Sequence, residues 1–332
     1  NNIVVMLDEL NLGSTELAFT KVDANNTNKA VKGAKFELYK DGVKIDSAES
    51  DDSGNVVFAN KLTYSVAKGA TTTYTVKEVG PADGYVLATG EITVSIDSTG
   101  KITMSGANVI ADTMKVTNVP ETGTLKITKT IEGDLTPDEA KGDLTFTVKN
   151  TATGETKDYT IVPDFTPNAD GVYELVLTET AGTYEVTETV RNRDGYVLTS
   201  TYSVNGAGPE AGKVTDVTVT AGHESVVAYK NVYDAIEGTF SKQTLKPGDS
   251  SYSELPGASL KLTSSDADLS KVTAKNPSDV TEFDNTDGVI TWKSGNKPLV
   301  LTKLPVGSYT LTETAKLDDY LISSDVTFTV ND

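Results

Sequence analysis

A strict alternation of apolar and polar residues recurs three times along the chain. Each time the order is Tyr, any residue, Val or Leu, any residue, Glu, at Tyr74–Glu78, Tyr184–Glu188 and Tyr309–Glu313. A period of two is typical of a half-buried β-strand. The Glu shares the parity of the Tyr and the aliphatic residue, so it points into a core, where a carboxylate needs a partner. The pattern therefore predicts three related β-domains.

Other strand-like segments recur in a fixed order around this one. Each unit opens with a strand that carries an inward Lys, and the first two units close with a strand that carries an inward Asn. An Asp-Gly turn before a Tyr follows the first two Glu strands, and Asp319-Tyr320 is a degenerate third copy. Such turn-rich self-similarity predicts an all-β fold of three tandem immunoglobulin-like sandwich domains. The opening and closing strands are Leu17–Lys21, Leu125–Lys129, Gly238–Lys242, Met114–Asn118 and Val227–Asn231.

The repeats place the domain boundaries in two short linkers. We expect domain 1 over residues 13–119, domain 2 over 120–234 and domain 3 over 235–332, with an orphan strand in residues 1–12 before them. Short linkers leave little freedom between neighbouring domains. The sequence therefore predicts a stiff rod of domains joined end to end.

Composition narrows the class of protein. The 332 residues carry a formal net charge of -19 and no Cys. The charge disfavours nucleic acid and anionic membranes as partners, and no apolar run is long enough to span a membrane. A single His without Cys argues against a zinc site or a Ser-His-Asp triad, so we expect no cofactor and no metal. A secreted β-protein without disulfides needs another source of stability.

The inward Lys, Glu and Asn of each complete unit form a set with its own chemistry. Burial in an apolar core favours the neutral forms of an amine and of a carboxylic acid. A neutral amine is a nucleophile, and a protonated Glu can polarise an Asn carbonyl and carry protons as ammonia leaves. The product is an amide formed once per domain without turnover, so we expect no enzyme activity. For any single set, a buried ion pair beside an amide is the alternative.

These residues resemble the collagen-adhesin B-type (CnaB-like) domains of Gram-positive pilins and surface adhesins, over nearly the whole chain. Gly33–Leu38 and Leu255–Leu260 resemble that family's second strand. The resemblance implies an extracellular location at the cell surface or cell wall, and internal Lys–Asn isopeptide bonds that form autocatalytically. It assigns proton shuttling to Glu78, Glu188 and Glu313, and the bonds to Lys21 with Asn118, Lys129 with Asn231, and Lys242 in the third unit.

The third unit departs from the pattern. No Asn follows Glu313 at the distance seen in the other units, and Phe328–Asn331 aligns with Ile92–Ser95, one strand too early. At the other end, Asn11 precedes Lys21 much as Asn118 precedes Lys129. One hypothesis is that the chain is a fragment of a longer protein.

The other hypothesis for the ends is donor-strand exchange. Residues 3–11 of one copy would complete domain 3 of the next by strand addition, in a head-to-tail filament. Asn11 would then bond to Lys242 of the neighbouring copy. Glu9 counts against this bond, because it would share the inward face with Asn11 unless a bulge intervenes.

The function we expect is that of a shaft subunit of a Gram-positive pilus, with copies of itself, a sortase and host extracellular matrix as partners. The alternative is the stalk or ligand-binding region of a cell-wall-anchored host-matrix adhesin. Val119–Gly123 resembles a sortase motif, but no hydrophobic span and basic tail follow it, so we interpret it as a linker. A glycosidase-like carboxylate pair is a third hypothesis, but the Glu residues fall one per domain.

Overall fold

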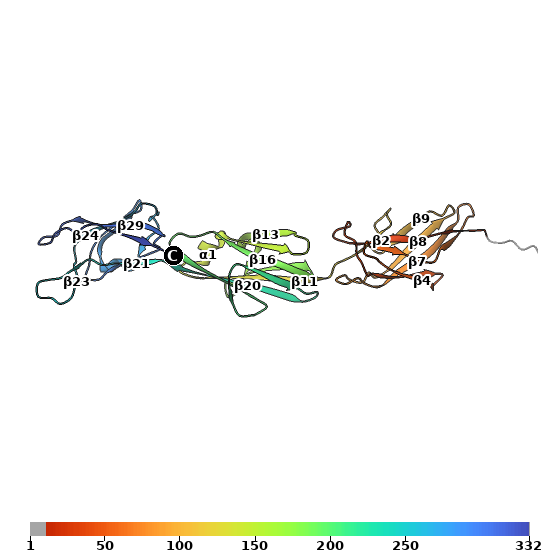
Figure 1. Cartoon of the computed structure of the whole chain (residues 1–332), viewed down its shortest axis with the longest axis horizontal. Helices are drawn as coiled ribbons and strands as arrows, with labels where there is room; N and C mark the ends of the chain where they lie inside the picture. Colours follow the sequence, from red (N-terminus) through yellow and green to blue (C-terminus); the bar gives the residue numbers. More distant parts are fainter. Residues whose placement is uncertain (1–10, 332) are drawn as a thin grey trace, which may run out of the picture. The chain divides into compact units, whose positions relative to one another are not determined.

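A computed structural model describes residues 11–331 of the chain. Strands make up 55% of the residues and helices 4%, which confirms the all-β prediction (Figure 1). The chain divides into two compact units. Unit 1 contains the residues up to Thr124 together with 178–182 and 219–224, and unit 2 contains the rest.

The first sandwich, β1 to β10, pairs a five-stranded sheet with a smaller one. The large sheet has the order β4-β3-β7-β8-β9, and all its neighbours are antiparallel. The facing sheet has the order β10-β2-β5, in which β10 runs parallel to β2, and β1 pairs with β6. The strands are β1 (Leu12–Thr15), β2 (Ala18–Asp23), β3 (Lys35–Lys40), β4 (Val43–Glu49), β5 (Asn55–Val57), β6 (Leu62–Ser65), β7 (Thr71–Gly80), β8 (Glu91–Asp97), β9 (Ile102–Gly106) and β10 (Lys115–Asn118).

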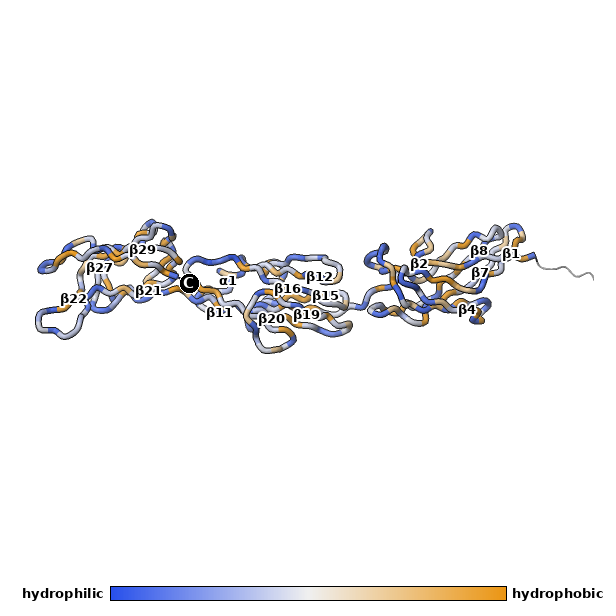
Figure 2. Tube along the Cα trace, in the orientation of Figure 1, coloured by the Kyte–Doolittle hydropathy of each residue, from blue (hydrophilic) through white to orange (hydrophobic). Residues whose placement is uncertain are grey.

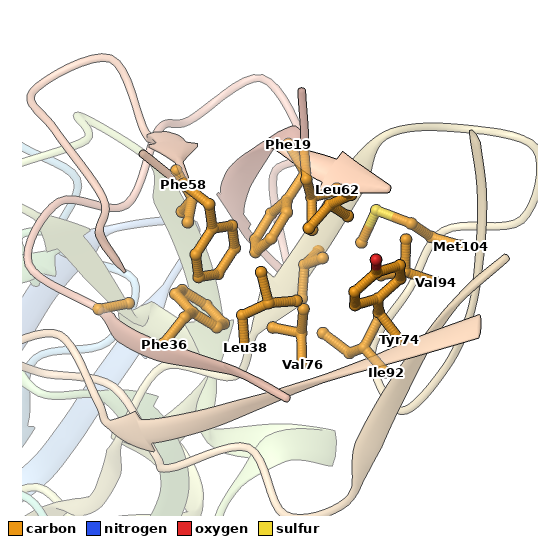
Figure 3. Packing of buried hydrophobic residues seen from close by; sticks show 14 of the residues in the cluster. Phe19, Phe36, Leu38, Phe58, Leu62, Tyr74, Val76, Ile92, Val94 and Met104 are labelled. Atoms are coloured by element: carbon orange, nitrogen blue, oxygen red, sulfur yellow. The ribbon is translucent and has the colours of Figure 1, made fainter. Parts of the chain in front are cut away.

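Inward side chains of both sheets fill the core of this sandwich (Figure 3). Phe19 of β2 packs edge-on against Phe36 of β3, with 5.1 Å between ring centroids. Burying each such ring stabilises the fold by about 1.5–3 kcal/mol. Apolar and polar residues alternate along the strands, as the colours of Figure 2 show, so the same pattern that predicts the strands also selects the core.

The second sandwich, β11 to β20, has two larger sheets. Their orders are β14-β15-β11-β20-β17-β18 and β13-β12-β16-β19. Phe146 of one sheet lies 5.5 Å from Tyr229 of the other, which joins the two layers. The elements are β11 (Thr122–Gly133), α1 (Pro137–Ala140), η1 (Lys141–Asp143), β12 (Leu144–Asn150), β13 (Thr156–Thr160), α2 (Ile161–Asp164), β14 (Thr166–Pro167), β15 (Tyr173–Thr180), β16 (Gly182–Val190), β17 (Tyr196–Val204), β18 (Glu210–Ala211), β19 (Val214–Val219) and β20 (Glu224–Ala235).

The third sandwich, β21 to β30, lies within unit 2. Its sheets have the orders β26-β27-β24-β29-β30, β21-β28-β25 and β22-β23. The elements are β21 (Glu237–Phe240), β22 (Gln243–Thr244), β23 (Ser253–Glu254), β24 (Ser259–Ser264), β25 (Thr273–Ala274), η2 (Pro277–Asp279), β26 (Thr281–Thr286), β27 (Val289–Lys293), β28 (Leu299–Thr302), β29 (Gly307–Ala315) and β30 (Val326–Val330).

One edge of the third sandwich is open. β21 pairs with β28 as β2 pairs with β5, but among the described residues no strand lies beside β21 in the place that β10 takes beside β2. The inward side chains of β30, Phe328 and Val330, are only partly buried, whereas Val94 and Ile96 of β8 are 0% exposed. The core of the third sandwich is therefore less completely covered than that of the first.

The pairing of β30 also corrects a detail of the sequence alignment. Phe328 lies opposite Tyr309, as Val94 lies opposite Tyr74. Phe328 therefore corresponds to Val94, and the alignment of Phe328 with Ile92 was wrong by two residues. The parity of the strand is unchanged by a shift of two, so the inward face is the same.

A turn of the same shape recurs in all three sandwiches, just before the Tyr that follows the Glu strand. The residue before that Tyr has a positive φ: 79° at Gly84, 83° at Gly195 and 67° at Asp319. Gly adopts this conformation freely, and Asp is among the few other residues that tolerate it. This explains how the third copy keeps the turn although its Gly is missing.

No helix among the described residues is long and apolar enough to cross a membrane.

Candidate functional site

The first candidate site joins three strands of the first sandwich around one carboxylate. Lys21 of β2 donates from Nζ to Glu78 Oε2 of β7 at 3.0 Å, and Asn118 of β10 donates from Nδ2 to Glu78 Oε1 at 2.7 Å. Lys21 and Asn118 are 0% exposed, and Glu78 is 8% exposed. The structure therefore brings together the three residues that the sequence assigns to this unit, with the Glu between the other two.

Backbone carbonyls and an aromatic ring complete the surroundings of this site. Lys21 Nζ also donates to the Thr117 carbonyl at 2.8 Å and lies 5.4 Å from the centre of the Phe36 ring. Asn118 Nδ2 also donates to the Val86 carbonyl at 3.2 Å, while Asn118 Oδ1 is buried without a hydrogen-bond partner. A buried carbonyl oxygen without a donor is costly. This oxygen is open to a proton donor.

The second candidate site repeats the arrangement in the second sandwich. Lys129 Nζ of β11 lies 2.5 Å from Glu188 Oε1 of β16, and Asn231 Nδ2 of β20 donates to the same oxygen at 3.3 Å. Lys129 and Asn231 are 0% exposed. Glu188 Oε2 and Asn231 Oδ1 are both buried without a hydrogen-bond partner. Again the Glu lies between the amine and the amide.

Burial lowers the pKa of the lysine in both sites. Desolvation lowers the pKa of Lys21, against the opposing charge of Glu78. Desolvation also lowers the pKa of Lys129, to about 8, although the negative charge of Glu188 acts to raise it. Lower pKa values increase the fraction of neutral amine near neutral pH. An amine in this state can attack a carbonyl carbon, which an ammonium cannot.

The third candidate site is different. Lys242 Nζ lies 3.0 Å from Glu313 Oε2 and donates to Ser323 Oγ at 2.5 Å, and Ser323 N donates to Glu313 Oε2 at 2.7 Å. The Lys242 side chain is 15% exposed, whereas those of Lys21 and Lys129 are 0% exposed. Among the described residues no Asn side chain bonds to this Glu.

The carboxylate of the third site is held in its charged form. Desolvation raises the pKa of Glu313, but hydrogen bonds from Ser323 and Lys242 outweigh it and leave the pKa below its usual value. The Glu313 carboxylate is therefore ionised at neutral pH. Asn11, the predicted partner of Lys242 in a neighbouring copy, is exposed at the start of the described residues. Residues 3–10 of the predicted donor strand, including Glu9, lie outside the described residues.

Two residues of these sites were missed by the sequence analysis. Val86 and Ser323 each follow the turn with positive φ, Val86 by two residues from Gly84 and Ser323 by four from Asp319. Their position after a shared turn was a usable signal, because a recurring turn brings the residues behind it to one place in each sandwich.

Three side chains outside the candidate sites, Trp292, His223 and Asp51, have structural roles. Trp292 is 3% exposed and packs edge-on against Phe240, with 5.9 Å between ring centroids, so it belongs to the core of the third sandwich. The Nδ1 atom of His223 lies 2.8 Å from the Ala221 carbonyl at a turn. Asp51 Oδ1 accepts hydrogen bonds from the backbone N of Ser53 and of Asn55, so this carboxylate stabilises a turn.

Comparison with known proteins gives a family match for the first and third sandwiches. A family model described as SpaA, a prealbumin-like fold domain, matches residues 15–109 and 241–332, more than half of the chain. No curated protein matches the chain.

Solved structures with similarity to the chain include one further Bacillus protein and two pilus proteins. The Bacillus anthracis TIE protein has 18% identity and a TM-score of 0.40, covering 96% of this chain and 48% of its own, so the chain spans about half of its length. BcpA, the major pilin subunit of Bacillus cereus, has 14% identity and a TM-score of 0.33, covering 97% and 96%. A C-terminal fragment of the pilus adhesin SpaC from Lactobacillus rhamnosus GG has 15% identity and a TM-score of 0.30, covering 71% and 100%.

Proposed function

The chain belongs to the family of SpaA prealbumin-like fold domains, and we propose that it is a structural shaft subunit of a Gram-positive cell-surface pilus whose first two sandwiches close autocatalytic isopeptide bonds. The observation that carries the proposal is the Glu78 carboxylate between the Lys21 amine and the Asn118 amide. The same arrangement around Glu188 supports it independently. Such bonds would resist force and proteases in a chain without Cys.

The proposed reaction is balanced within each site. The neutral Lys21 amine attacks Asn118 Cγ, and the Nζ–Cγ bond forms as the Cγ–Nδ2 bond breaks. Protonated Glu78 donates a hydrogen bond to Asn118 Oδ1 as negative charge develops there. Glu78 then gives its proton to Nδ2 and takes one from Nζ, so that ammonia leaves, the carbonyl re-forms and Glu78 is protonated again. Each site acts once, so the chain has no turnover and is not an enzyme. Glu188 plays the same part for Lys129 and Asn231.

A buried ion pair with a neighbouring amide is the competing interpretation. It accounts for one site. It does not explain why the side-chain carbonyl oxygens of Asn118 and Asn231, two residues that are 0% exposed, both lack a hydrogen-bond partner. A stable buried pair normally satisfies all its polar atoms.

The proposal keeps the domain boundaries after residues 119 and 234. Leu12 is assigned to the first sandwich, because β1 pairs with β6.

The third sandwich supports a proposal about assembly. The open edge of β21 and the half-buried inward side of β30 are what a sandwich short of one strand presents. We propose that residues 3–11 of a second copy add to this edge, and that repeated addition of this kind builds a filament. Within the same proposal Asn11 of the added strand approaches Lys242 and Glu313. A sortase and host extracellular matrix remain the further partners proposed, at the cell wall.

Intact mass of the denatured chain tests the proposal. Each bond removes one ammonia, so we expect the unmodified chain to lack two. Lys21→Met and Lys129→Met should each restore one ammonia, and Lys242→Met should restore none. An unmodified chain at its full calculated mass would reduce both sites to buried polar clusters and remove the main support for the pilus assignment.

A further inference from the structure

The amide of Asn118 is held from two sides, and only one of them is the predicted Glu. One Nδ2 hydrogen points to Glu78 Oε1 at 2.7 Å and the other to the Val86 carbonyl at 3.2 Å. In the proposed reaction this nitrogen is the leaving group. Val86 therefore fixes the plane of the amide and accepts a hydrogen bond from the departing ammonia. The inference that follows rests on the proposed function.

The Val86 carbonyl is placed by a loop that runs along the end of β10. The loop begins with the turn at Gly84, in which Tyr85 N donates to the Ala82 carbonyl at 3.1 Å. Val86 N donates to the Val119 carbonyl, and Glu121 N donates to the Gly84 carbonyl, each at 2.9 Å. The backbone alone thus aligns the loop with the segment that carries Asn118, but it does not attach the loop to β2, which carries Lys21.

That attachment is made by a buried acid. Tyr85 OH donates to Asp23 Oδ2 at 2.8 Å. Asp23 is 3% exposed and lies on β2, two residues after Lys21 and opposite Asn118 in the parallel pair. Lys29 donates to the same carboxylate oxygen at 3.2 Å, and Asn25 N donates to Oδ1 at 2.7 Å. Both carboxylate oxygens are therefore occupied, which gives the Tyr85 hydroxyl a fixed acceptor.

We propose that Asp23 and Tyr85 are positioning residues for the first isopeptide bond. Their hydrogen bond ties the loop to the strand of the nucleophile, so that the Val86 carbonyl holds the leaving amide at a fixed place relative to the Lys21 amine. Neither side chain touches the reacting atoms. Their contribution lies in orientation, where displacements of about 1 Å cost as much as 10²-fold in rate.

The second sandwich provides a control within the same chain. Asp23 follows Lys21 by two residues in the first sandwich, and the residue at the equivalent position after Lys129 in β11 is Ile131. The second site therefore has no carboxylate at this position, and its bond should not respond to changes at Asp23 or Tyr85. A second control is Tyr39→Phe, which removes a hydroxyl that donates to Glu37 on another strand of the first sandwich.

The test measures the closing rate of both bonds after synthesis of the full chain in a cell-free system. Samples are denatured at intervals and digested, and the cross-linked peptides of each site are quantified by mass. We expect Tyr85→Phe and Asp23→Ala to slow the first bond by about tenfold or more, with the second bond unchanged. Asp23→Asn keeps an acceptor for the Tyr85 hydroxyl and should recover most of the rate, whereas Tyr39→Phe should match the unmodified chain.

The same series separates positioning from folding. Sucrose favours the folded state without replacing a lost hydrogen bond. A first bond that stays slow in sucrose supports positioning, and recovery in sucrose would mean that the variants only destabilise the sandwich. Unchanged rates in Tyr85→Phe and Asp23→Ala would overturn the inference and leave the proposed function intact. Absence of the first bond from the unmodified chain would overturn both.

Discussion

The Lys242 amine donates a 2.5 Å hydrogen bond to the Ser323 hydroxyl. Ser323 also donates from its backbone N to Glu313, so it contacts both members of the pair. In the first sandwich the second partner of the Glu is an amide side chain. A hydroxyl group offers no carbonyl carbon to an amine, so within residues 11–331 the third site has the nucleophile and the carboxylate but no group to react with.

We therefore predict that Lys242 keeps its free amine in a single chain. Acylation of the denatured protein with an amine-reactive anhydride, followed by digestion, should modify Lys242 completely. Lys21 and Lys129 should escape, because their nitrogens are already amides in the proposed product. Lys68, an exposed residue that belongs to none of the three candidate sites, serves as a positive control for labelling. Protection of Lys242 in monomeric protein would contradict the prediction.

Each Glu should govern its own bond. We expect Glu78→Gln to abolish the first bond and Glu188→Gln the second, because an amide side chain cannot carry the proton. Each variant also leaves a buried Lys without its counter-charge, a loss of about 3–5 kcal/mol for a pair of this kind. Peptide mapping gives the bonds, and urea unfolding gives the free energy. Glu91→Gln, which removes an exposed partner of Lys77, should change neither. Loss of both bonds in one variant would contradict independent sites.

The first isopeptide bond should stabilise its sandwich mainly by lowering the conformational entropy of the unfolded chain. It ties residues about 100 positions apart, for which the loop model gives ~4–5 kcal/mol. We expect Lys21→Met and Asn118→Ala to lower the free energy of unfolding by about that amount each. The double variant should lose little more, because both changes remove one bond. Additive losses in urea unfolding would show that the two side chains act separately.

The pH dependence of the second sandwich follows from Lys129 when its bond is blocked. In Asn231→Ala the amine stays free, and desolvation holds its pKa at about 8 against the ordinary 10.5. Above pH 8 the unfolded chain keeps a proton that the folded chain has released, so stability should rise with pH. The rise should end near pH 10. Burial raises the pKa of Tyr229 above the ordinary 10.0, so above pH 10 the unfolded chain loses the Tyr229 proton while the folded chain keeps it, and stability falls with pH. The midpoint of urea unfolding, measured as a function of pH, gives this change in stability. The double variant Lys129→Met/Asn231→Ala should show no rise.

Parity in the sequence was enough to predict the Lys–Glu–Asn sets. Lys21, Glu78 and Asn118 share the parity of core residues on strands that recur, so their meeting follows once the strands pair. The Val86 carbonyl could not be predicted in this way, because a backbone acceptor leaves no trace in residue type. The contact between Asp23 and Tyr85 depends on a loop path, which alternation does not specify. Ser323 was missed because it stands four residues after the turn residue Asp319, whereas Val86 stands two residues after Gly84.

The open edge of β21 leads to a prediction about a donated strand. In the first sandwich Val116 lies opposite Lys21 and Asn118 opposite Asp23 along the parallel pair. If Asn11 takes the place of Asn118, Glu9 takes that of Val116, which is 1% exposed. A peptide of residues 2–12 should therefore bind the chain weakly, and its Glu9→Val form should bind at least about tenfold more tightly, since burying a Val contributes about 1.5–3 kcal/mol.

Covalent capture is the stricter form of this prediction. Peptide that reaches the third site should become bonded to Lys242 with loss of one ammonia, and the product should survive boiling in detergent. Lys242→Arg chains and Asn11→Ala peptide should bind without this step, because one lacks the nucleophile and the other the carbonyl. Binding without any covalent product, even for the Glu9→Val peptide, would support strand addition but exclude the isopeptide bond. In that case the amide of Asn11 would have reached Lys242 without reacting. Absence of binding by every peptide would exclude this segment as the donor and assign the edge of β21 to a different strand.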